Sequence, residues 1–226
     1  MTVVVIPVYN EVTQLDFTAP HQFLTMIPDI TVVVASIGGT PVTSSGLSFD
    51  KLADLEAIER CDVICVPGGL GCIDAMEDSR FLSAVRRLAG TATYLTSVCS
   101  GSLILGAAGL LKGRRAASHW AWLDMLPAFG ATPEKARVVR DENIITGGGV
   151  TAGADFALTL ISELRGADAA QCVQLALEYA PAPTFDAGNA DTAPTHIRYM
   201  VIGQLAELMK DTRQRIESVA SRTGER

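Results

Sequence analysis

Four short runs of apolar, mostly β-branched residues constrain the fold of this chain more than any other feature of its sequence. They span residues 3–8, 30–35, 63–67 and 93–98. None shows the polar alternation of a strand that has one solvated face. Such runs are typical of strands covered on both faces, so the sequence predicts a parallel sheet between layers of helices.

Helical patterns follow these runs and continue beyond the last of them. The apolar spacing predicts helices over residues 19–26, 79–88, 100–111, 152–164 and 167–177, and a final amphipathic helix over 197–221. Strands that alternate with helices predict an α/β fold, a doubly wound sandwich with a mostly parallel sheet. We expect residues 1–226 to form a single domain.

Turn-forming residues predict three interruptions of this pattern. Hairpins are expected over residues 41–49 and around residues 141–143, both as antiparallel additions. Residues 180–194 are rich in Pro, Ala, Gly and Asp, and they are expected to cross the surface without regular structure.

Composition and charge exclude several classes of function. A formal charge of −7 and a pI near 4.9 argue against nucleic acid as a partner. The N-terminal run TVVVIPV is too short for a signal peptide, and no apolar run reaches membrane-spanning length. Five cysteines, an odd number, fit a reducing compartment. We therefore expect a cytoplasmic protein with no membrane partner.

Cys99 lies where an apolar strand run meets a predicted helix. The unpaired N–H groups and the dipole at a helix start favour a thiolate and can hold a developing anion. Ser97, Ser100, Gly101 and Ser102 are small, so backbone and substrate can approach closely, as at the nucleophile turn of hydrolases. The pattern predicts a nucleophile, although a buried, inert cysteine fits it equally well.

Two further segments are expected at the same edge of the sheet, because both follow strands. The loop PGGLG at residues 67–71 can turn N–H groups toward an anion, and Gly69, Leu70 and Ser100 are the candidate oxyanion donors. An ordinary tight turn is the alternative. Asp16 lies between apolar neighbours, which predicts a raised pKa and a proton to share. A helix-capping role is its alternative, although Thr18 is the better-placed cap.

Six tracts resemble a known family, and together they extend over essentially the whole chain. PGG at residues 67–69, VCSGSLILGAAGLLKGRRAASHW at 98–120 and GGGVTAGADFALTLISEL at 147–164 resemble the PfpI branch of the class I glutamine amidotransferase-like superfamily. LDFTAPHQFL at 15–24, SHWAWLDML at 118–126 and LEYAPAPTFDAGNADTAP at 177–194 resemble the isocyanide hydratases within that branch.

This resemblance implies a flavodoxin-like sandwich that forms a homodimer, with Cys99 and Asp16 as catalytic residues. It also implies a hydro-lyase activity that converts a small isocyanide to an N-substituted formamide. Many members carry threonine after the cysteine; Ser100 keeps the hydroxyl, so its hydrogen-bonding role is expected to survive.

The expected mechanism requires no metal or organic cofactor. The Cys99 thiolate attacks the isocyanide carbon while Asp16 donates a proton, and water then hydrolyses the thioimidate with Asp16 as base. Cys61 and Cys65 have no histidine or second pair at metal-ligand spacing.

The expected substrate pocket is made of apolar side chains near the cysteine. Its candidate lining residues are Phe17, Leu70, Trp120 and Val150.

Four alternatives remain open from the sequence. His119 could serve as the base of a Cys–His enzyme, or it could have a structural role beside Trp120. A glyoxalase- or deglycase-like enzyme of the same superfamily would use the same cysteine, usually with glutamate in place of Asp16. A sensing module related to the N-terminal domains of AraC-type regulators and a redox sensor are the non-catalytic alternatives.

Overall fold

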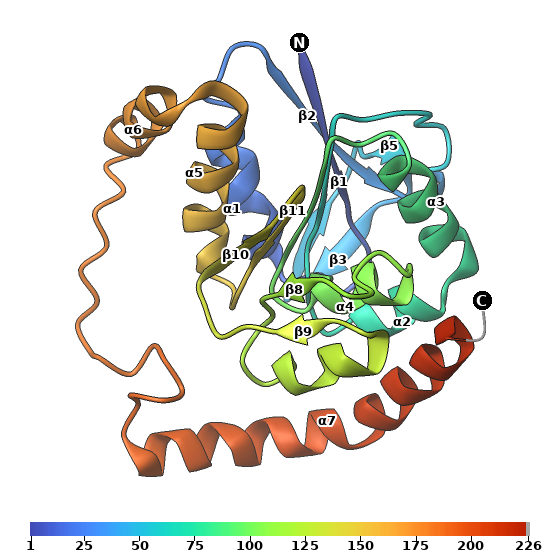
Figure 1. Ribbon diagram of the computed structural model, residues 1–226, viewed down its shortest axis with the longest axis vertical. Helices are drawn as coiled ribbons and strands as arrows, with labels where there is room; N and C mark the ends of the chain where they lie inside the picture. Colours follow the sequence, from blue (N-terminus) through green and yellow to red (C-terminus); the bar gives the residue numbers. More distant parts are fainter. Residues whose placement is uncertain (225–226) are drawn as a thin grey trace.

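A seven-stranded sheet forms the centre of the molecule in the computed structural model, which describes residues 1–224 except for the side chains of residues 207, 208, 223 and 224. The strand order is β10-β11-β7-β6-β1-β2-β5, and every neighbouring pair is parallel except β10–β11 (Figure 1). The strands are β1 (Thr2–Pro7), β2 (Ile30–Ser36), β5 (Ala53–Asp54), β6 (Val63–Val66), β7 (Tyr94–Val98), β10 (Val138–Asp141) and β11 (Ile144–Gly147).

The four predicted apolar runs form β1, β2, β6 and β7. All four residues of β6 are buried, as are the last four of β1 and of β7, because helices cover both faces of the sheet. The prediction of a doubly wound, mostly parallel sandwich is therefore confirmed.

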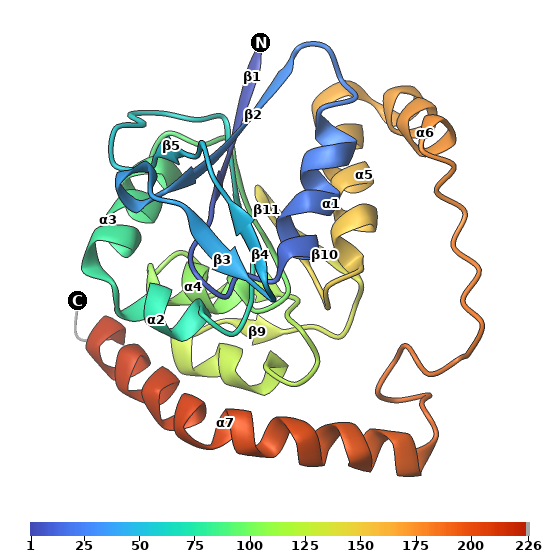
Figure 2. The same cartoon turned by 180° about the vertical axis from the view of Figure 1, so that it is seen from behind.

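Helices cover the two faces unequally. On one face α1 and α5 pack against each other, and on the other α2, α3 and α4 lie together (Figures 1 and 2). The last helix, α7, packs across α2, α4 and the 3₁₀ helix η2. The helices are α1 (Gln14–Leu24), α2 (Cys72–Glu77), α3 (Ser79–Ala89), α4 (Gly101–Ala107), α5 (Ala152–Arg165), α6 (Ala167–Ala176) and α7 (Thr195–Gly224), with the 3₁₀ helices η1 (Ile37–Gly39) and η2 (Leu123–Phe129). No helix within the described part of the chain is long and apolar enough to span a membrane.

The start of α1 differs from the prediction, and the difference places Asp16. The helix begins at Gln14 rather than at residue 19, with Thr13 as its N-cap, so Thr18 lies inside the helix. The expectation that Thr18 caps it is wrong, because a tertiary contact fixes the start: the Thr13 N–H donates to the Gly68 carbonyl at 2.9 Å. Asp16 consequently lies in the first turn, beside the glycine loop.

The other helices agree with their predicted positions, with three differences. The helix after Cys99 ends at Ala107 rather than at residue 111, because Gly109 adopts a left-handed φ of 81°. The short helix α2 was not predicted. The final helix runs a few residues beyond its predicted range at both ends.

Both predicted hairpins are present. β3 (Val42–Ser44) and β4 (Leu47–Phe49) form a separate antiparallel pair, whereas β10 and β11 extend the main sheet. A small parallel pair, β8 (Arg115–Ala116) with β9 (Thr132–Pro133), was not predicted. Residues 177–194, which we call the strap, connect α6 to α7 without helix or strand and stand off from the body of the molecule, as expected of a surface crossing (Figure 2).

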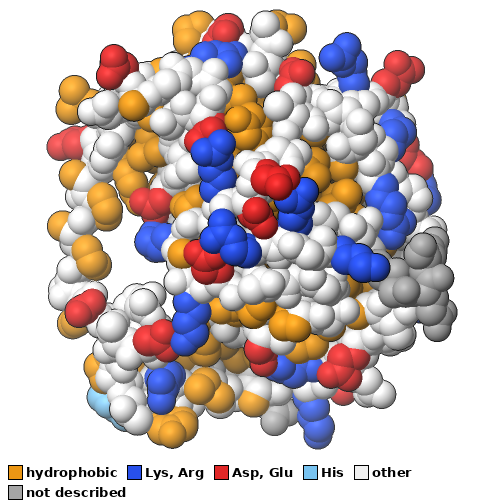
Figure 3. Space-filling view, in the orientation of Figure 1, with side chains coloured by type: hydrophobic (Ala, Val, Ile, Leu, Met, Phe, Trp, Pro, Cys, Tyr) orange, Lys and Arg blue, Asp and Glu red, His pale blue; other side chains and the backbone are white. Residues whose placement is uncertain are grey.

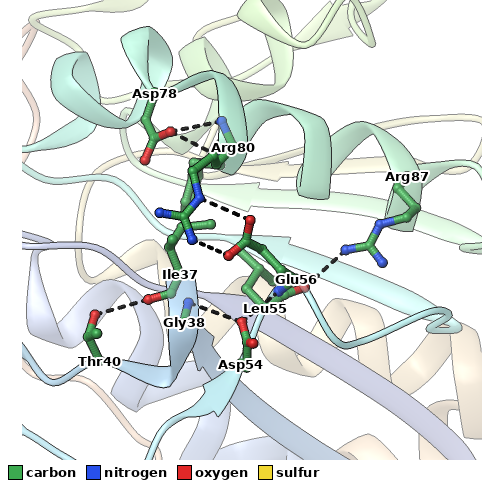
Figure 4. A network of polar contacts seen from close by, with 10 residues as sticks. Ile37, Gly38, Thr40, Asp54, Leu55, Glu56, Asp78, Arg80 and Arg87 are labelled. Atoms are coloured by element: carbon green, nitrogen blue, oxygen red, sulfur yellow. Dashed lines mark hydrogen bonds and ion pairs between the residues drawn. The ribbon is translucent and has the colours of Figure 1, made fainter.

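A polar network fastens the loop after β5 to α3 (Figure 4). Arg80 forms an ion pair with Glu56, and Arg87 donates to the Leu55 carbonyl at 3.1 Å. Asp78 caps α3 by accepting the Arg80 N–H at 2.8 Å. The Arg80–Glu56 pair is largely exposed, so solvent screens it and it adds little to stability, whereas the cap contributes about 1 kcal/mol.

Candidate active site

Cys99 lies on a tight turn between β7 and α4. Its φ of 58° is in the left-handed region, which costs on the order of 1–3 kcal/mol for a residue with a side chain. Surrounding backbone holds the turn, since the Cys99 N–H donates to the carbonyls of Gly147 at 3.1 Å and Gly148 at 2.7 Å. The nucleophile turn predicted at Cys99 is therefore present, and the residue is only 6% exposed.

Asp16 is completely buried beside the thiol of Cys99. Its Oδ2 atom accepts the Gly68 N–H at 3.0 Å, and its Oδ1 atom has no hydrogen-bond partner among the described residues. Burial raises the pKa of the carboxyl from 3.8 to about 7, against the lowering effects of the Gly68 N–H and the Cys99 thiol. The carboxyl does not cap the helix, and a group with this pKa can give and take a proton near neutral pH.

The thiol of Cys99 differs from the expectation of a thiolate at rest. Burial, followed by the negative charge of Asp16, raises its pKa well above the ordinary value, and these effects outweigh the Ser100 N–H that lowers it. The helix start therefore acts in the expected direction, but it does not make the thiolate the resting form. A transfer of the thiol proton to Asp16 would neutralise the carboxylate whose charge disfavours the thiolate.

The glycine loop lies against the turn and is linked to it by Ser100. Gly69 has a φ of 144°, and a Cβ there would collide with the backbone of Val12 and Thr13, so only glycine fits. The Gly69 N–H donates to the Ser100 Oγ at 3.1 Å. The Gly69 N–H, which was predicted as an oxyanion donor, is thus hydrogen-bonded to Ser100 in the resting site. The side chain of Leu70 in the same loop is exposed.

A hollow of about 830 Å³ lies between the body and the strap, and Ser118, Gly148, Trp120 and Val150 contribute to its wall. Ser118 and Gly148 are hydrogen-bonded to the backbone of Cys99, so the hollow adjoins the turn.

Two of the four residues that were expected to line a substrate pocket, Trp120 and Val150, line this hollow. Phe17 does not line this hollow, because it is buried edge-on against Phe49, with ring centroids 5.0 Å apart. Leu70 is exposed elsewhere, in the glycine loop.

His119 forms part of the wall of this hollow. Its Nδ1 atom accepts the Ala121 N–H at 3.3 Å, and its ring lies against Gly149 and 5.6 Å from the ring of Trp120. Burial lowers its pKa, which favours the neutral ring. Neither the pKa of Cys99 nor that of His119 is shifted by the other, whereas Asp16 shifts that of Cys99. The arrangement favours the structural alternative for His119.

The sequence reasoning missed the groups that hold the Cys99 backbone. The hydroxyls of Ser118 and Ser102 donate to the Cys99 carbonyl at 3.1 and 3.3 Å. The glycine run that begins at Gly147 is a signal of close backbone approach that could have indicated the contact with the Cys99 N–H. Ser118 has no such local signal, because only the fold brings it to Cys99.

Comparison with known proteins places this arrangement in a family. Residues 2–163 match the DJ-1/PfpI family. The chain belongs to this family. The isonitrile hydratase of Pseudomonas putida is 55% identical to this chain over 190 residues, which are 84% of this chain and 83% of that protein.

A solved structure and a regulator extend the comparison. The THiJ/PfpI family protein from Pseudomonas syringae superposes with a TM-score of 0.91 and 41% sequence identity. The matched part is 97% of this chain and 90% of the Pseudomonas syringae chain. The HTH-type transcriptional regulator GlxA of Rhizobium meliloti is 37% identical over 63% of this chain, which corresponds to only 44% of the regulator. The predicted resemblance to the PfpI branch is confirmed.

Proposed function

We propose that this DJ-1/PfpI protein hydrates isocyanides, also called isonitriles, to N-substituted formamides. One observation carries the proposal: a fully buried Asp16 carboxyl, with a pKa raised to about 7, lies against the Cys99 thiol. The similarity to an isonitrile hydratase supports the same chemistry. Isocyanide hydration needs a nucleophile at carbon and a nearby group that both gives and accepts protons, and this pair supplies both.

The first step forms a carbon–sulfur bond. The Cys99 proton passes to Asp16, and the thiolate attacks the terminal carbon of the isocyanide R–N≡C. The carbon gains negative charge and takes the proton from Asp16, which gives the thioimidate R–N=CH–S–Cys99 and leaves Asp16 as a carboxylate.

The second step adds water to this intermediate. The Asp16 carboxylate removes a proton from water as the oxygen attacks the thioimidate carbon, and Asp16 then passes that proton to the nitrogen to give R–NH–CH(OH)–S–Cys99. The carbon–sulfur bond of the tetrahedral adduct then breaks to give R–NH–CHO, and the hydroxyl proton passes through Asp16 to the sulfur, which regenerates the thiol. We assign the N–H groups of Gly69, Leu70 and Ser100 to stabilise charge during these steps, which requires Gly69 to exchange its bond with the Ser100 hydroxyl.

A spectrophotometric assay with a simple aryl isocyanide tests the proposal. Formation of the N-aryl formamide by the purified protein is the expected result, and methylglyoxal serves as the comparison substrate. Conversion of methylglyoxal without hydration of the isocyanide would instead support the glyoxalase- or deglycase-like alternative. No turnover of either substrate would contradict the proposed enzyme and favour a sensing role.

Replacement of His119 by glutamine is expected to reduce kcat/KM by less than about tenfold, within the range of imperfect positioning. The ring contacts Gly149 and accepts a backbone N–H, so glutamine removes packing rather than a catalytic base. Steady-state kinetics measure the effect, and thermal unfolding serves as the control. A loss as large as that of Cys99→Ala in a normally folded variant would assign the chemistry to a Cys–His pair.

We further propose that the protein is a homodimer whose interface includes the strap and the start of α7. Large apolar side chains are exposed there, with Phe185 at 79% and Tyr199 at 63%, and both line the hollow. Figure 3 shows hydrophobic side chains at the surface along the strap. Exposed apolar surface of this kind is typical of an interaction site.

Light scattering is expected to give twice the chain mass of 23.9 kDa, and Phe185→Asp with Tyr199→Asp is expected to give the monomer. A monomeric wild-type protein at micromolar concentration would contradict this proposal. Two further predictions, the cytoplasmic location and the single domain over residues 1–226, stay proposals based on the sequence.

A further inference from the structure

Two buried hydroxyl groups hold the carbonyl of Cys99. Ser118 donates to it at 3.1 Å and Ser102 at 3.3 Å. In a regular helix this carbonyl would receive the N–H of Leu103, but that N–H bonds to the Ser100 carbonyl at 3.0 Å. The Cys99 carbonyl therefore has no helical N–H partner, because the backbone of Cys99 is left-handed, and the two hydroxyls donate to it instead.

The two hydroxyls are anchored differently. Ser102 lies in the first turn of α4, so it moves with the turn that it contacts. Ser118 comes from a segment beyond β8, and its neighbour Ala117 donates its N–H to the Thr146 Oγ1 of β11 at 2.8 Å. The end of β11 also accepts the Cys99 N–H. Ser118 thus links the carbonyl of Cys99 to β11, the strand that also accepts the N–H of Cys99.

The Cys99 carbonyl and the Ser100 N–H belong to one peptide group. That group is planar, so an orientation imposed on the oxygen is imposed on the N–H, which points the opposite way. The Ser100 N–H is close enough to the Cys99 thiol to lower its pKa. A bond to the carbonyl also polarises the peptide and strengthens its N–H as a donor.

We propose that Ser118 is a positioning residue for the Cys99 nucleophile, because its hydroxyl orients the Cys99–Ser100 peptide and with it the N–H that faces the sulfur. The inference rests on the proposed function in taking Cys99 as the nucleophile. Without the Ser118 hydroxyl, the peptide rotates away from its strained orientation, and the sulfur loses both its donor and its alignment with Asp16.

Three variants test this role, with Ser36→Ala as the matched control. Ser36 is a buried serine at the end of β2, and its hydroxyl donates to the carbonyl of Thr40, so the control also removes a hydroxyl–carbonyl bond. Ser118→Ala removes the hydroxyl and Ser118→Thr keeps it. Ser118→Cys takes the place of the alanine variant if that variant does not fold, because the thiol is a weaker donor.

Two measurements are made on each variant. The first is the rate at which iodoacetamide alkylates Cys99, followed by peptide mass spectrometry so that the exposed Cys172 is counted separately. It requires no isocyanide. The second separates kcat from KM for hydration of an aryl isocyanide.

Ser118→Ala is expected to slow both alkylation and kcat by about 10- to 100-fold, the scale of a misplaced catalytic group, with KM unchanged within about twofold. Ser118→Thr is expected to restore both rates, and Ser36→Ala to match the wild type. Ser118→Ala rates equal to those of Ser36→Ala would overturn the proposal, as would a threonine variant as slow as alanine. Wild-type protein that alkylates at Cys99 but forms no formamide contradicts the proposed function, and the alkylation rates still decide the role of Ser118.

Discussion

Replacing Cys99 by alanine is expected to abolish isocyanide hydration while the fold is retained. The reaction proceeds through a carbon–sulfur bond, so no other group in the site can replace the sulfur. Cys99→Ser is expected to be equally inactive, because a hydroxyl is a far weaker nucleophile than a thiol at neutral pH. Formamide production under saturating isocyanide measures the loss.

Cys61→Ala is the matched control for this experiment. Cys61 is as buried as Cys99, but its Sγ contacts the Leu88 carbonyl at 3.8 Å, at the opposite end of the sheet. It is expected to retain activity at a somewhat reduced stability. A Cys99→Ala variant that keeps more than about a few per cent of wild-type turnover would show that the covalent mechanism is wrong.

Replacing Asp16 by asparagine is expected to lower activity by roughly 100- to 10,000-fold, the range of general acid–base groups. Asparagine keeps the shape and can still accept the Gly68 N–H, but it cannot carry a proton. Asp62→Asn is the matched control, because Asp62 accepts the Val3 N–H at 2.8 Å at the opposite end of the strands from Cys99. Near-normal activity of Asp16→Asn would assign the proton transfers to water or to His119.

Although Asp16→Asn is expected to lower activity, it is expected to make the protein more stable relative to the wild type as the pH rises. The folded protein holds the pKa of Asp16 at about 7, above the ordinary 3.8, so folding favours the protonated carboxyl. Its contribution to stability is complete below pH 3.8 and is lost as the pH rises through 7. Between pH 5 and 8.5 the wild type should therefore lose about 3 kcal/mol relative to Asp16→Asn.

Urea unfolding of both proteins at these two pH values measures the difference. The comparison removes any constant cost of burying the asparagine amide, because that cost is the same at both pH values. A difference that does not change with pH would show that Asp16 ionises at its ordinary pKa in the folded protein.

The parts of the site that the sequence predicted are those set by local pattern. The strand run before Cys99 and the helix after it are contiguous, so the turn could be placed from residues 93–102 alone. The start of α1 could not, because it depends on the bond between Thr13 and Gly68. The direction of the Cys99 pKa was also missed, because burial acts through the whole core whereas the helix start acts only locally.

Acid-quenched mass spectrometry of the wild-type protein during its first turnover of an aryl isocyanide tests directly whether hydration proceeds through Cys99. We expect an increase equal to the whole mass of the isocyanide, located on Cys99 by peptide mapping, that appears before the formamide and decays as the formamide forms. The Cys99→Ala variant should show no such increase. Formamide that accumulates with no adduct on Cys99 at any time would contradict the account.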